Sequence, residues 1–271
     1  MLPRTLMGGE GEIVLVLEKS PDAPPNVQYL LLATKQTGTL QREMTQAARN
    51  GFALISVVSR GEHMVILEKS SAAPTGEPDA NRKYLLLATE KTSTMQKELD
   101  NNAATGYRLM AGSPTSQSEI AMFMEQVTET TGTFKYKLLA TTRTSTLQNE
   151  LNVAGGDGFH LLWQTVSGKR GTKGGFLGRM ATRGMSLAAD EIVGVMELNT
   201  NFTKRYEYLV LDTSRTRTMQ SELSKAVQDG YVPAAIVRSP SGDSSVVPIG
   251  GNPVGSNLIV ILERSIPRSG K

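Results

Sequence analysis

The feature of this 271-residue chain that most limits its fold is a pattern of residues that occurs four times. Each copy begins with a Tyr that opens a short apolar segment, and a Gln, a Glu and a Gly follow twelve, fourteen and twenty-two residues later. The recurring residues are Tyr29, Tyr84, Tyr136 and Tyr208; Gln41, Gln96, Gln148 and Gln220; Glu43, Glu98, Glu150 and Glu222; and Gly51, Gly106, Gly158 and Gly230. Because so many positions keep one spacing, we expect the four copies to share one fold.

The spacing within a copy predicts a β-α-β-β unit. Residues 29–34 of the first copy, Tyr-Leu-Leu-Leu-Ala-Thr, are apolar and bounded by polar residues, as in a buried strand. The residues that follow carry the buried stripe of a helix, Leu40, Met44, Ala47 and Ala48. The recurring Gly is predicted to end the helix, because glycine takes the left-handed conformation at that position without strain. A second strand follows at residues 52–59, and a third ends at Glu68.

The order of these elements predicts an α+β fold in which each copy forms a three-stranded mixed sheet, in the order 1-3-2, with one helix. A right-handed crossover makes the first two strands parallel, and the third returns between them. The third strand is almost continuously apolar, as in residues 259–262, which indicates that both of its faces are covered. One helix covers one face, so we expect the other face to pack against a neighbouring copy, in two pseudo-dimeric pairs or a closed array of four.

The predicted repeats cover residues 29–70, 84–126, 136–199 and 206–266. The third and fourth contain insertions at residues 168–190 and 239–256, both in the hairpin between the second and third strands. Residues 11–19 match the last strand of an incomplete repeat, and we expect this orphan strand to pair with the sheet of another copy.

Ser and Thr residues gather where each helix is expected to start. Ser93 with Gln96, and Ser145 with Gln148, have the spacing of a capping box. A pair of Thr residues recurs in every copy, as Thr37 does in the first, and is predicted to cap the helix. The alternative is that these hydroxyls and the free N–H groups of the helix start bind an anion.

The recurring Glu residues are the best candidates for acid–base chemistry. One set lies in the predicted helices, and a second set ends the apolar third strands, at Glu18, Glu68, Glu125, Glu197 and Glu263. Two carboxylates facing each other across a cleft would suit a hydrolase. A catalytic pair is normally unique, whereas these recur in every copy, which favours structural roles. We expect the helical set to lie near the positive end of the helix dipole, and the strand set to guard sheet edges against pairing.

The composition leaves little material for a metal or cofactor site. Cysteine is absent, and the only histidines, His63 and His160, occupy unlike positions of the repeat, so no metal site and no cofactor is predicted. Trp163 is expected in the core. No apolar run approaches the roughly 18 residues of a transmembrane segment. We expect a cytoplasmic protein if Met1 is the true start, and an exported one, periplasmic or extracellular, if an upstream signal peptide is missing.

The unit resembles a small bacterial β-α-β-β domain family of unknown function, which usually occurs as a single copy with a Leu-Asn…Gly-Trp-Glu-Leu signature. The third copy matches best, with Leu151-Asn152 and residues 158–162, although Phe159 replaces the Trp. The string Ala-Thr-x-x-Thr-x-Thr-[Leu/Met]-Gln-x-Glu is also similar to repeats in uncharacterised exported bacterial proteins. The resemblance implies a fold and brings no activity or ligand with it.

The positive charge of the chain is concentrated in the first insertion. Its basic residues, with no acidic residue among them, are Lys169, Arg170, Lys173, Arg179 and Arg183. Without these five the chain carries 24 basic and 26 acidic residues, a net charge of −2 instead of +3. Three functions follow as hypotheses, in decreasing order of preference. They are a non-enzymatic scaffold or binding module with a protein partner at the insertions, a polyanion-binding protein that uses the basic loop, and a carboxylate-based hydrolase.

The basic loop gives the first testable prediction. Replacing its five basic residues together with Gln should abolish binding to heparin or single-stranded DNA, and the lost affinity should be the part that falls with salt. Binding titrations at two salt concentrations measure this salt-dependent part of the affinity. The control replaces five basic residues elsewhere, Lys35, Arg42, Arg49, Lys91 and Lys97. Unchanged binding by the loop variant would remove the polyanion hypothesis.

Overall fold

The structure is a computed structural model of the chain, and its described residues fall into thirteen stretches. They are 2–8, 13–18, 26–59, 62–69, 82–89, 91–114, 119–127, 133–141, 143–167, 191–201, 204–213, 215–238 and 258–266. The two predicted insertions, 168–190 and 239–256, lie outside the described residues, and so do the five basic residues of the first one.

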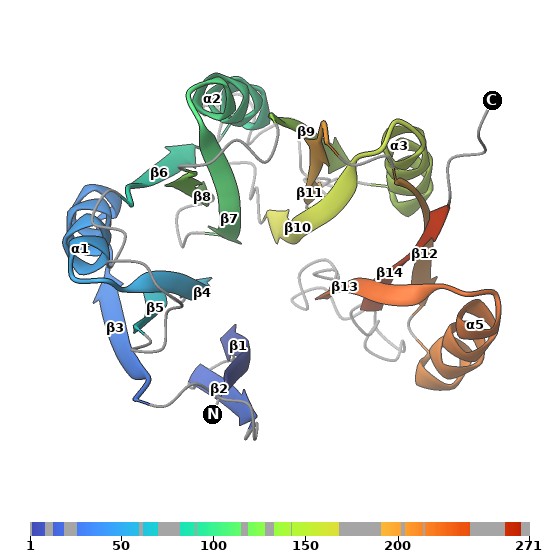
Figure 1. The fold of residues 1–271 in the computed structure, drawn as a ribbon. Helices are drawn as coiled ribbons and strands as arrows, with labels where there is room; N and C mark the ends of the chain where they lie inside the picture. Colours follow the sequence, from blue (N-terminus) through green and yellow to red (C-terminus); the bar gives the residue numbers. More distant parts are fainter. Residues whose placement is uncertain are drawn as a thin grey trace, which may run out of the picture. The chain divides into compact units, whose positions relative to one another are not determined.

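The predicted β-α-β-β order is present in all four copies (Figure 1). Repeat 1 consists of β3 (Gln28–Thr34), α1 (Thr37–Arg49), β4 (Ala53–Ser59) and β5 (His63–Lys69). Repeat 2 consists of β6 (Tyr84–Thr89), α2 (Thr92–Ala104), β7 (Tyr107–Pro114) and β8 (Ile120–Gln126). Repeat 3 consists of β9 (Phe134–Thr141), α3 (Thr144–Gly156), β10 (His160–Ser167) and β11 (Glu191–Asn199). Repeat 4 consists of β12 (Arg205–Thr213), α5 (Thr216–Gln228), β13 (Val232–Arg238) and β14 (Leu258–Ile266).

Each repeat forms a sheet of three strands in the predicted order, with the third strand of the repeat in the middle. In repeats 1, 2 and 4 this central strand runs antiparallel to both neighbours. The first and second strands are parallel to each other but never adjacent. The sheets are therefore antiparallel, and the description of them as mixed is wrong.

The start of each helix differs from the prediction. The residue before each helix, such as Lys91 in repeat 2, has an extended backbone and makes no side-chain cap. Ser93 and Ser145 are the second residues of their helices, so the predicted capping boxes are wrong. The Thr that ends the first strand bonds the backbone just before the helix: its hydroxyl accepts the N–H of the residue two positions later, which is the residue that precedes the helix. The pairs are Thr34–Gln36, Thr89–Lys91, Thr141–Arg143 and Thr213–Arg215, each 3.2 Å apart.

The end of each helix follows the prediction. All four recurring glycines have a positive φ, between 83° at Gly230 and 98° at Gly158. After α1 the Gly51 N–H donates to the Ala48 carbonyl at 2.8 Å, and the Phe52 N–H donates to the Ala47 carbonyl at 3.1 Å. This pair of bonds closes the helix and directs the chain into the second strand.

The second strand of every repeat contains a bulge at the same position. The register shifts after the second or third residue of the strand, which leaves one residue without a partner on the central strand. The unpaired residues are Ile55, Met110, Leu162 and Ala234. The bulge disturbs the ladder beside it, and the preceding N–H becomes available for another partner.

The predicted orphan strand does not join the sheet of a complete repeat. It forms β2 (Ile13–Glu18) and pairs antiparallel with β1 (Leu2–Gly8) in a sheet of two strands. The expectation that it pairs with another copy is therefore wrong, and β1 contacts β4 of repeat 1.

The chain divides into two compact units, residues 1–134 with repeats 1 and 2, and residues 135–271 with repeats 3 and 4. Within each unit the central strand of the second repeat is buried on both faces. In repeat 4, Ile259 and Ile261 pack in one core with α3, whereas Val260 and Leu262 pack with residues of α5. In repeat 2, Phe123 packs likewise in one core with α1. The prediction that the second face packs against a neighbouring copy is confirmed for both pairs.

The glycines that end the helices give the second prediction. We expect Gly158→Ala to lower the free energy of unfolding more than Gly230→Ala, although a left-handed residue with a Cβ costs about 1–2 kcal/mol at either position. A Cβ on Gly158 would lie 3.2 Å from Leu198 Cδ1 and 3.3 Å from the Lys204 carbonyl oxygen, whereas Gly230 has nothing within 4 Å. Urea unfolding measures the free energy of unfolding of both variants. A Gly230→Ala variant that is at least as destabilised would contradict this.

Candidate functional site

Half of the recurring Tyr and Gln residues meet at the joint between the two repeats of each unit, whereas Gln96 and Gln220 bond Asp100 and Ser224 of their own helices. Helix α1 of repeat 1 contacts the first strand of repeat 2, β6, and helix α3 of repeat 3 contacts the first strand of repeat 4, β12. The second strands also contact each other, β4 with β7 and β10 with β13. The joint is head to tail, because the helix and second strand of one repeat meet the first strand of the next.

The recurring Tyr of the second repeat in each unit crosses the joint. The hydroxyl of Tyr84 accepts the Leu54 N–H at 2.8 Å, and the hydroxyl of Tyr208 accepts the Leu161 N–H at 2.8 Å. Both donors immediately precede the bulge of their strand. Tyr84 and Tyr208 are 3% and 1% exposed, so the phenol replaces a ladder partner for an N–H that burial would otherwise leave unpaired.

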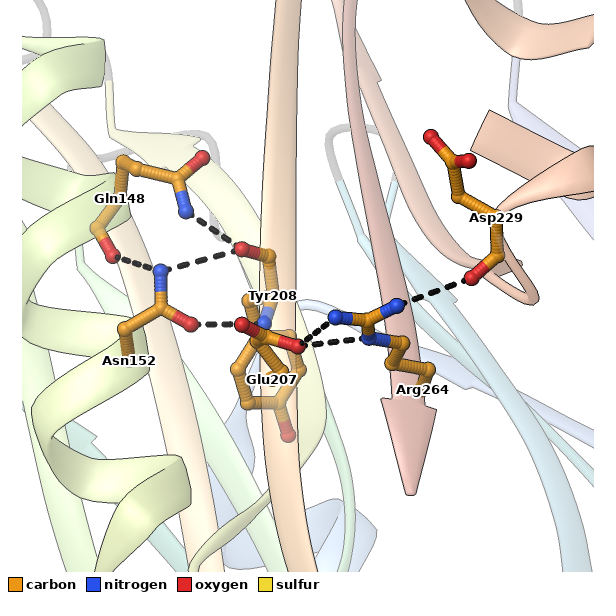
Figure 2. A network of polar contacts seen from close by, with 6 residues as sticks. All are labelled: Gln148, Asn152, Glu207, Tyr208, Asp229 and Arg264. Atoms are coloured by element: carbon orange, nitrogen blue, oxygen red, sulfur yellow. Dashed lines mark hydrogen bonds and ion pairs between the residues drawn. The ribbon is translucent and has the colours of Figure 1, made fainter. Parts of the chain in front are cut away.

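In each unit, the recurring Gln of the first of the two repeats forms hydrogen bonds with the edge strand of the next sheet. The Gln41 side-chain oxygen accepts the Leu86 N–H at 3.0 Å, and that of Gln148 accepts the Val210 N–H at 2.6 Å. The Gln148 amide group also donates to the Tyr208 carbonyl (Figure 2). An edge strand has N–H and C=O groups with no strand beside them, and the Gln amide offers one acceptor and one donor. The helix therefore bonds the edge much as another strand would.

In repeat 3 an Asn extends this contact by one helical turn. Asn152 Oδ1 accepts the Tyr208 N–H at 2.8 Å, and its Nδ2 donates to the Tyr208 carbonyl at 3.1 Å (Figure 2). The same position in repeat 1 is Thr45, whose hydroxyl donates to the Gln41 carbonyl of its own helix. Asn152 thus adds to the joint of repeats 3 and 4 a contact that Thr45 does not make in the joint of repeats 1 and 2.

The helix surface at the joint has a position that requires a small residue, nineteen residues after the recurring Tyr. It is Ala48 in repeat 1 and Gly155 in repeat 3, and both are buried. A Cβ on Gly155 would lie 2.3 Å from the Tyr206 carbonyl oxygen and 2.8 Å from Tyr208 Cε2. The backbone of β12 therefore approaches the helix too closely for any side chain there.

The strand Glu residues lie beside the recurring Tyr residues. Tyr29 is the register partner of Glu68, and the Tyr136 hydroxyl donates to Glu197 Oε2 at 2.9 Å. Glu68, Glu125, Glu197 and Glu263 belong to central strands and do not guard sheet edges, so that interpretation is wrong for these four; Glu18 lies on β2, in the sheet of two strands. Burial raises the pKa of Tyr84 to about 12, and it also raises the pKa of Tyr208, with a smaller contribution from Glu263. Both phenols therefore remain protonated at neutral pH and can donate as well as accept hydrogen bonds.

Further polar contacts surround the joint of repeats 3 and 4. His160 Nε2 lies 3.0 Å from Glu263 Oε1, and its ring centroid is 4.7 Å from that of Tyr206. Within repeat 4, Arg264 Nε donates to Glu207 Oε2 at 2.6 Å, and Arg264 also donates to the Asp229 carbonyl at 3.0 Å (Figure 2). His160 of repeat 3 thus contacts Glu263 of repeat 4, across the joint.

The helical Glu residues lie away from the helix start. Each is the seventh residue of its helix, and the first turns contain no acidic residue, so the predicted stabilisation by the helix dipole is wrong. Glu43 and Glu222 are exposed, and Glu98 and Glu150 are half-buried. The hydrolase hypothesis stays a prediction that no contact of these residues favours.

The remaining candidate residues do not gather into a site. His63 is buried, with its ring edge toward Phe123 at 6.3 Å between centroids, and burial lowers its pKa. Trp163 is half-buried. Among the described residues, no cluster of three His, Asp or Glu side chains has the arrangement of a metal site. None of the helices that the structure describes is long and apolar enough to cross a membrane.

These features define the class of the protein as a tandem β-α-β-β repeat protein whose repeats are joined in head-to-tail pairs. Comparisons with protein-family models, curated proteins and solved structures each found no match. The resemblance to the single-copy bacterial domain family therefore stays a prediction.

The close approach at Gly155 gives the third prediction. Gly155→Ala should lower the free energy of unfolding by about 2 kcal/mol or more, because overpacking of this kind costs roughly 1–3 kcal/mol. The control is Gly156→Ala, one residue further on, where an added Cβ meets nothing within 4 Å. We expect that variant to be unchanged or slightly more stable, since Ala favours a helix over Gly.

Urea unfolding of the two full-length variants measures the difference. Equal destabilisation by both substitutions would mean that the helix and β12 do not meet as described.

Proposed function

We propose that this protein is a non-enzymatic scaffold whose paired repeats hold two long hairpin insertions for binding a partner protein. The observation that carries the proposal is the role of the most regular polar residues. Tyr84, Tyr208, Gln41 and Gln148 bond backbone groups of the neighbouring repeat. A side chain that satisfies a buried backbone group is committed to holding the structure together.

The insertions leave the sheets at equivalent points, which supports their role as the binding elements. Ser167 pairs with Glu191 at the ends of β10 and β11, and Arg238 pairs with Leu258 at the ends of β13 and β14. The same β-hairpin in repeat 1 has only three residues, 60–62, between the paired Ser59 and His63. Long segments between rigid strands, in two repeats out of four, are typical of binding loops on a structural framework.

Helix starts lie at the same end of the sheets. Thr213 of β12 is the register partner of Leu258, and α5 begins three residues after it, at Thr216. A ligand held by the second insertion would therefore also be near the first turn of a helix, whose N–H groups favour acceptors and negative charge. An acidic or phosphate-bearing surface on the partner would suit this end of repeat 4.

Site-specific photo-crosslinking tests the proposal and is the fourth prediction. A photoreactive phenylalanine analogue replaces Phe176 in the first insertion, and in the matched control it replaces Val153, which is exposed on α3. After exposure to an extract of the source cells, the Phe176 chain should give an adduct of defined mass, and the Val153 chain should give none.

A second chain carries the probe at Ile249 of the second insertion and should give the same adduct. This adduct should disappear when residues 168–190 of that chain are replaced by Arg60-Gly61-Glu62, the short hairpin of repeat 1. The shortened chain should still unfold at the wild-type temperature. Adducts from Val153 alone, equal adducts from both positions, or none from Phe176 would contradict a partner at the insertions.

A further inference from the structure

The hairpin of β1 and β2 has the form of the second half of a repeat, and we call it the half repeat. Leu2 lies opposite Glu18, Pro3 lies opposite Leu17, and Arg4 is then left unpaired. The second and third strands of the complete repeats have the same register and the same bulge. β1 also contacts β4, as β4 contacts β7 and β10 contacts β13. The half repeat thus lies beside repeat 1 as a preceding repeat would.

The half repeat has an open sheet edge where a complete repeat has its first strand. Among the described residues β2 has one neighbouring strand, β1, whereas the third strand of every complete repeat lies between two strands. Each described helix belongs to a complete repeat. Residues 13–17 of β2, Ile-Val-Leu-Val-Leu, are as apolar as a central strand. An apolar strand at a sheet edge is a template for another strand.

The register shows which backbone groups of β2 lie on this open edge. In repeat 2 the Leu86 N–H faces away from β8, so the residues on either side of Leu86 bond the central strand, at Met122 and Met124. These two residues lie three and one positions before the recurring Glu. Leu15 and Leu17 lie three and one positions before Glu18, so their N–H and C=O groups face away from β1.

Repeat 1 is also less covered than the other second members of a joint. No residue of β3 is buried, whereas Tyr84 and Leu87 of β6 and Tyr208 and Leu211 of β12 are. Leu31 stands at the position where a helix Gln accepts the backbone N–H in both joints, and it is 62% exposed. The half repeat therefore provides a second strand beside repeat 1, and the features that are missing are those of a first strand and a helix.

We propose that a partner protein completes the half repeat with a strand and a following helix of this same repeat type. The strand would pair with β2, and the helix would lie against β3, where its Gln amide would accept the Leu31 N–H. Seven residues after the Gln the helix would carry Ala or Gly, as α1 and α3 do at Ala48 and Gly155. The argument is continuity with the two joints, where a strand and helix of the preceding repeat occupy this place.

Tyr29 takes no part in this contact. Its hydroxyl is hydrogen-bonded to Glu68, and Pro3, at the position of Leu54, has no N–H to donate to it. The space that β1 occupies is also left unchanged, because the incoming strand lies on the other side of β2.

A second copy of this chain has no strand and helix to spare. The recurring pattern occurs four times in the sequence, and all four of its first strands already belong to three-stranded sheets. Donating one of them would break a complete repeat, so the occupant is a different polypeptide. The half repeat is also separate in sequence from the insertions, so this proposal and the proposed function stand or fall separately.

A labelled peptide of residues 28–50 is the probe, because it contains a first strand and a helix with Gln41 and Ala48. Fluorescence anisotropy should show that it binds the full-length chain. Gln41→Leu in the peptide should weaken binding at least about tenfold, because the Leu31 N–H would be buried without an acceptor. Gln46→Leu is the matched control and should leave binding unchanged, since Gln46 is exposed in repeat 1.

Two further changes test the strand. A methyl group on the Leu30 nitrogen of the peptide should remove binding, because this N–H faces the central strand, whereas a methyl group on the Leu31 nitrogen, which faces away, should not. In the chain, Leu15→Pro removes an N–H of the open edge, where proline is tolerated, and should prevent binding at an unchanged melting temperature. If that chain does not fold, Leu31→Arg replaces it and should weaken binding by placing a charge against the helix.

Absence of binding by the unaltered peptide, or equal effects of a change and its control, would overturn the proposal. Full binding by a folded Leu15→Pro chain, or by the Leu31→Arg chain, would overturn it as well, since the peptide would then bind elsewhere.

Photo-crosslinking identifies the occupant. A photoreactive phenylalanine analogue replaces Leu31 in the full-length chain, which is then exposed to an extract of the source cells. Mass spectrometry of the adduct should give a peptide of another protein, with an apolar strand and then a helix that has a Gln and, seven residues on, an Ala or Gly. The unlabelled peptide of residues 28–50 should prevent this adduct. No adduct, a peptide without this pattern, or a peptide of this same polypeptide would contradict a partner at the half repeat.

Discussion

A sheet of three strands has two open edges, and the way this chain closes one of them governs the rest of its structure. The first strand of repeats 2 and 4 has outward-facing N–H and C=O groups that no strand of its own sheet can satisfy. The amide of Gln41 or Gln148, from the helix of the preceding repeat, bonds them instead. A neutral hydrogen bond contributes about 1 kcal/mol net, but a buried group left unpaired costs about 1–3 kcal/mol, so the joint must provide these partners.

Other recurring features follow from this contact. The helix must lie close to the strand for a Gln to reach its backbone, and Gly155 shows how little space remains between them. The bulge before Trp163 frees the Leu161 N–H, and the Tyr208 hydroxyl then accepts it. The apolar central strand is buried by its own helix on one face and by the preceding repeat on the other. Without the preceding repeat, the second face of the central strand in repeats 2 and 4 would be exposed.

The fold was more predictable from the sequence than the joints were. Strand order, helix positions and the left-handed glycines depend on local spacing and on chain connectivity, and periodicity reports both. Gln148 and Tyr208 lie 60 residues apart, so recurrence shows that each is needed but not that they meet. The capping boxes failed because the helix begins one residue before Ser93, so that Ser93 lies inside the helix although its spacing to Gln96 is that of a capping box. The bulges have no residue signature, because the unpaired residues Ile55, Met110, Leu162 and Ala234 share no common type.

Amide hydrogen exchange, followed residue by residue by NMR, tests most directly whether a helix amide closes the sheet edge. Leu31, Leu86 and Val210 are equivalent residues of first strands, and all three N–H groups face outward. Leu86 and Val210 are bonded to Gln41 and Gln148, whereas Leu31, on the first strand of repeat 1, is 62% exposed. If the helix amides close these edges, the N–H groups of Leu86 and Val210 exchange slowly and that of Leu31 exchanges fast. Exchange of Leu86 and Val210 as fast as that of Leu31 would show that the helix amides do not close these edges.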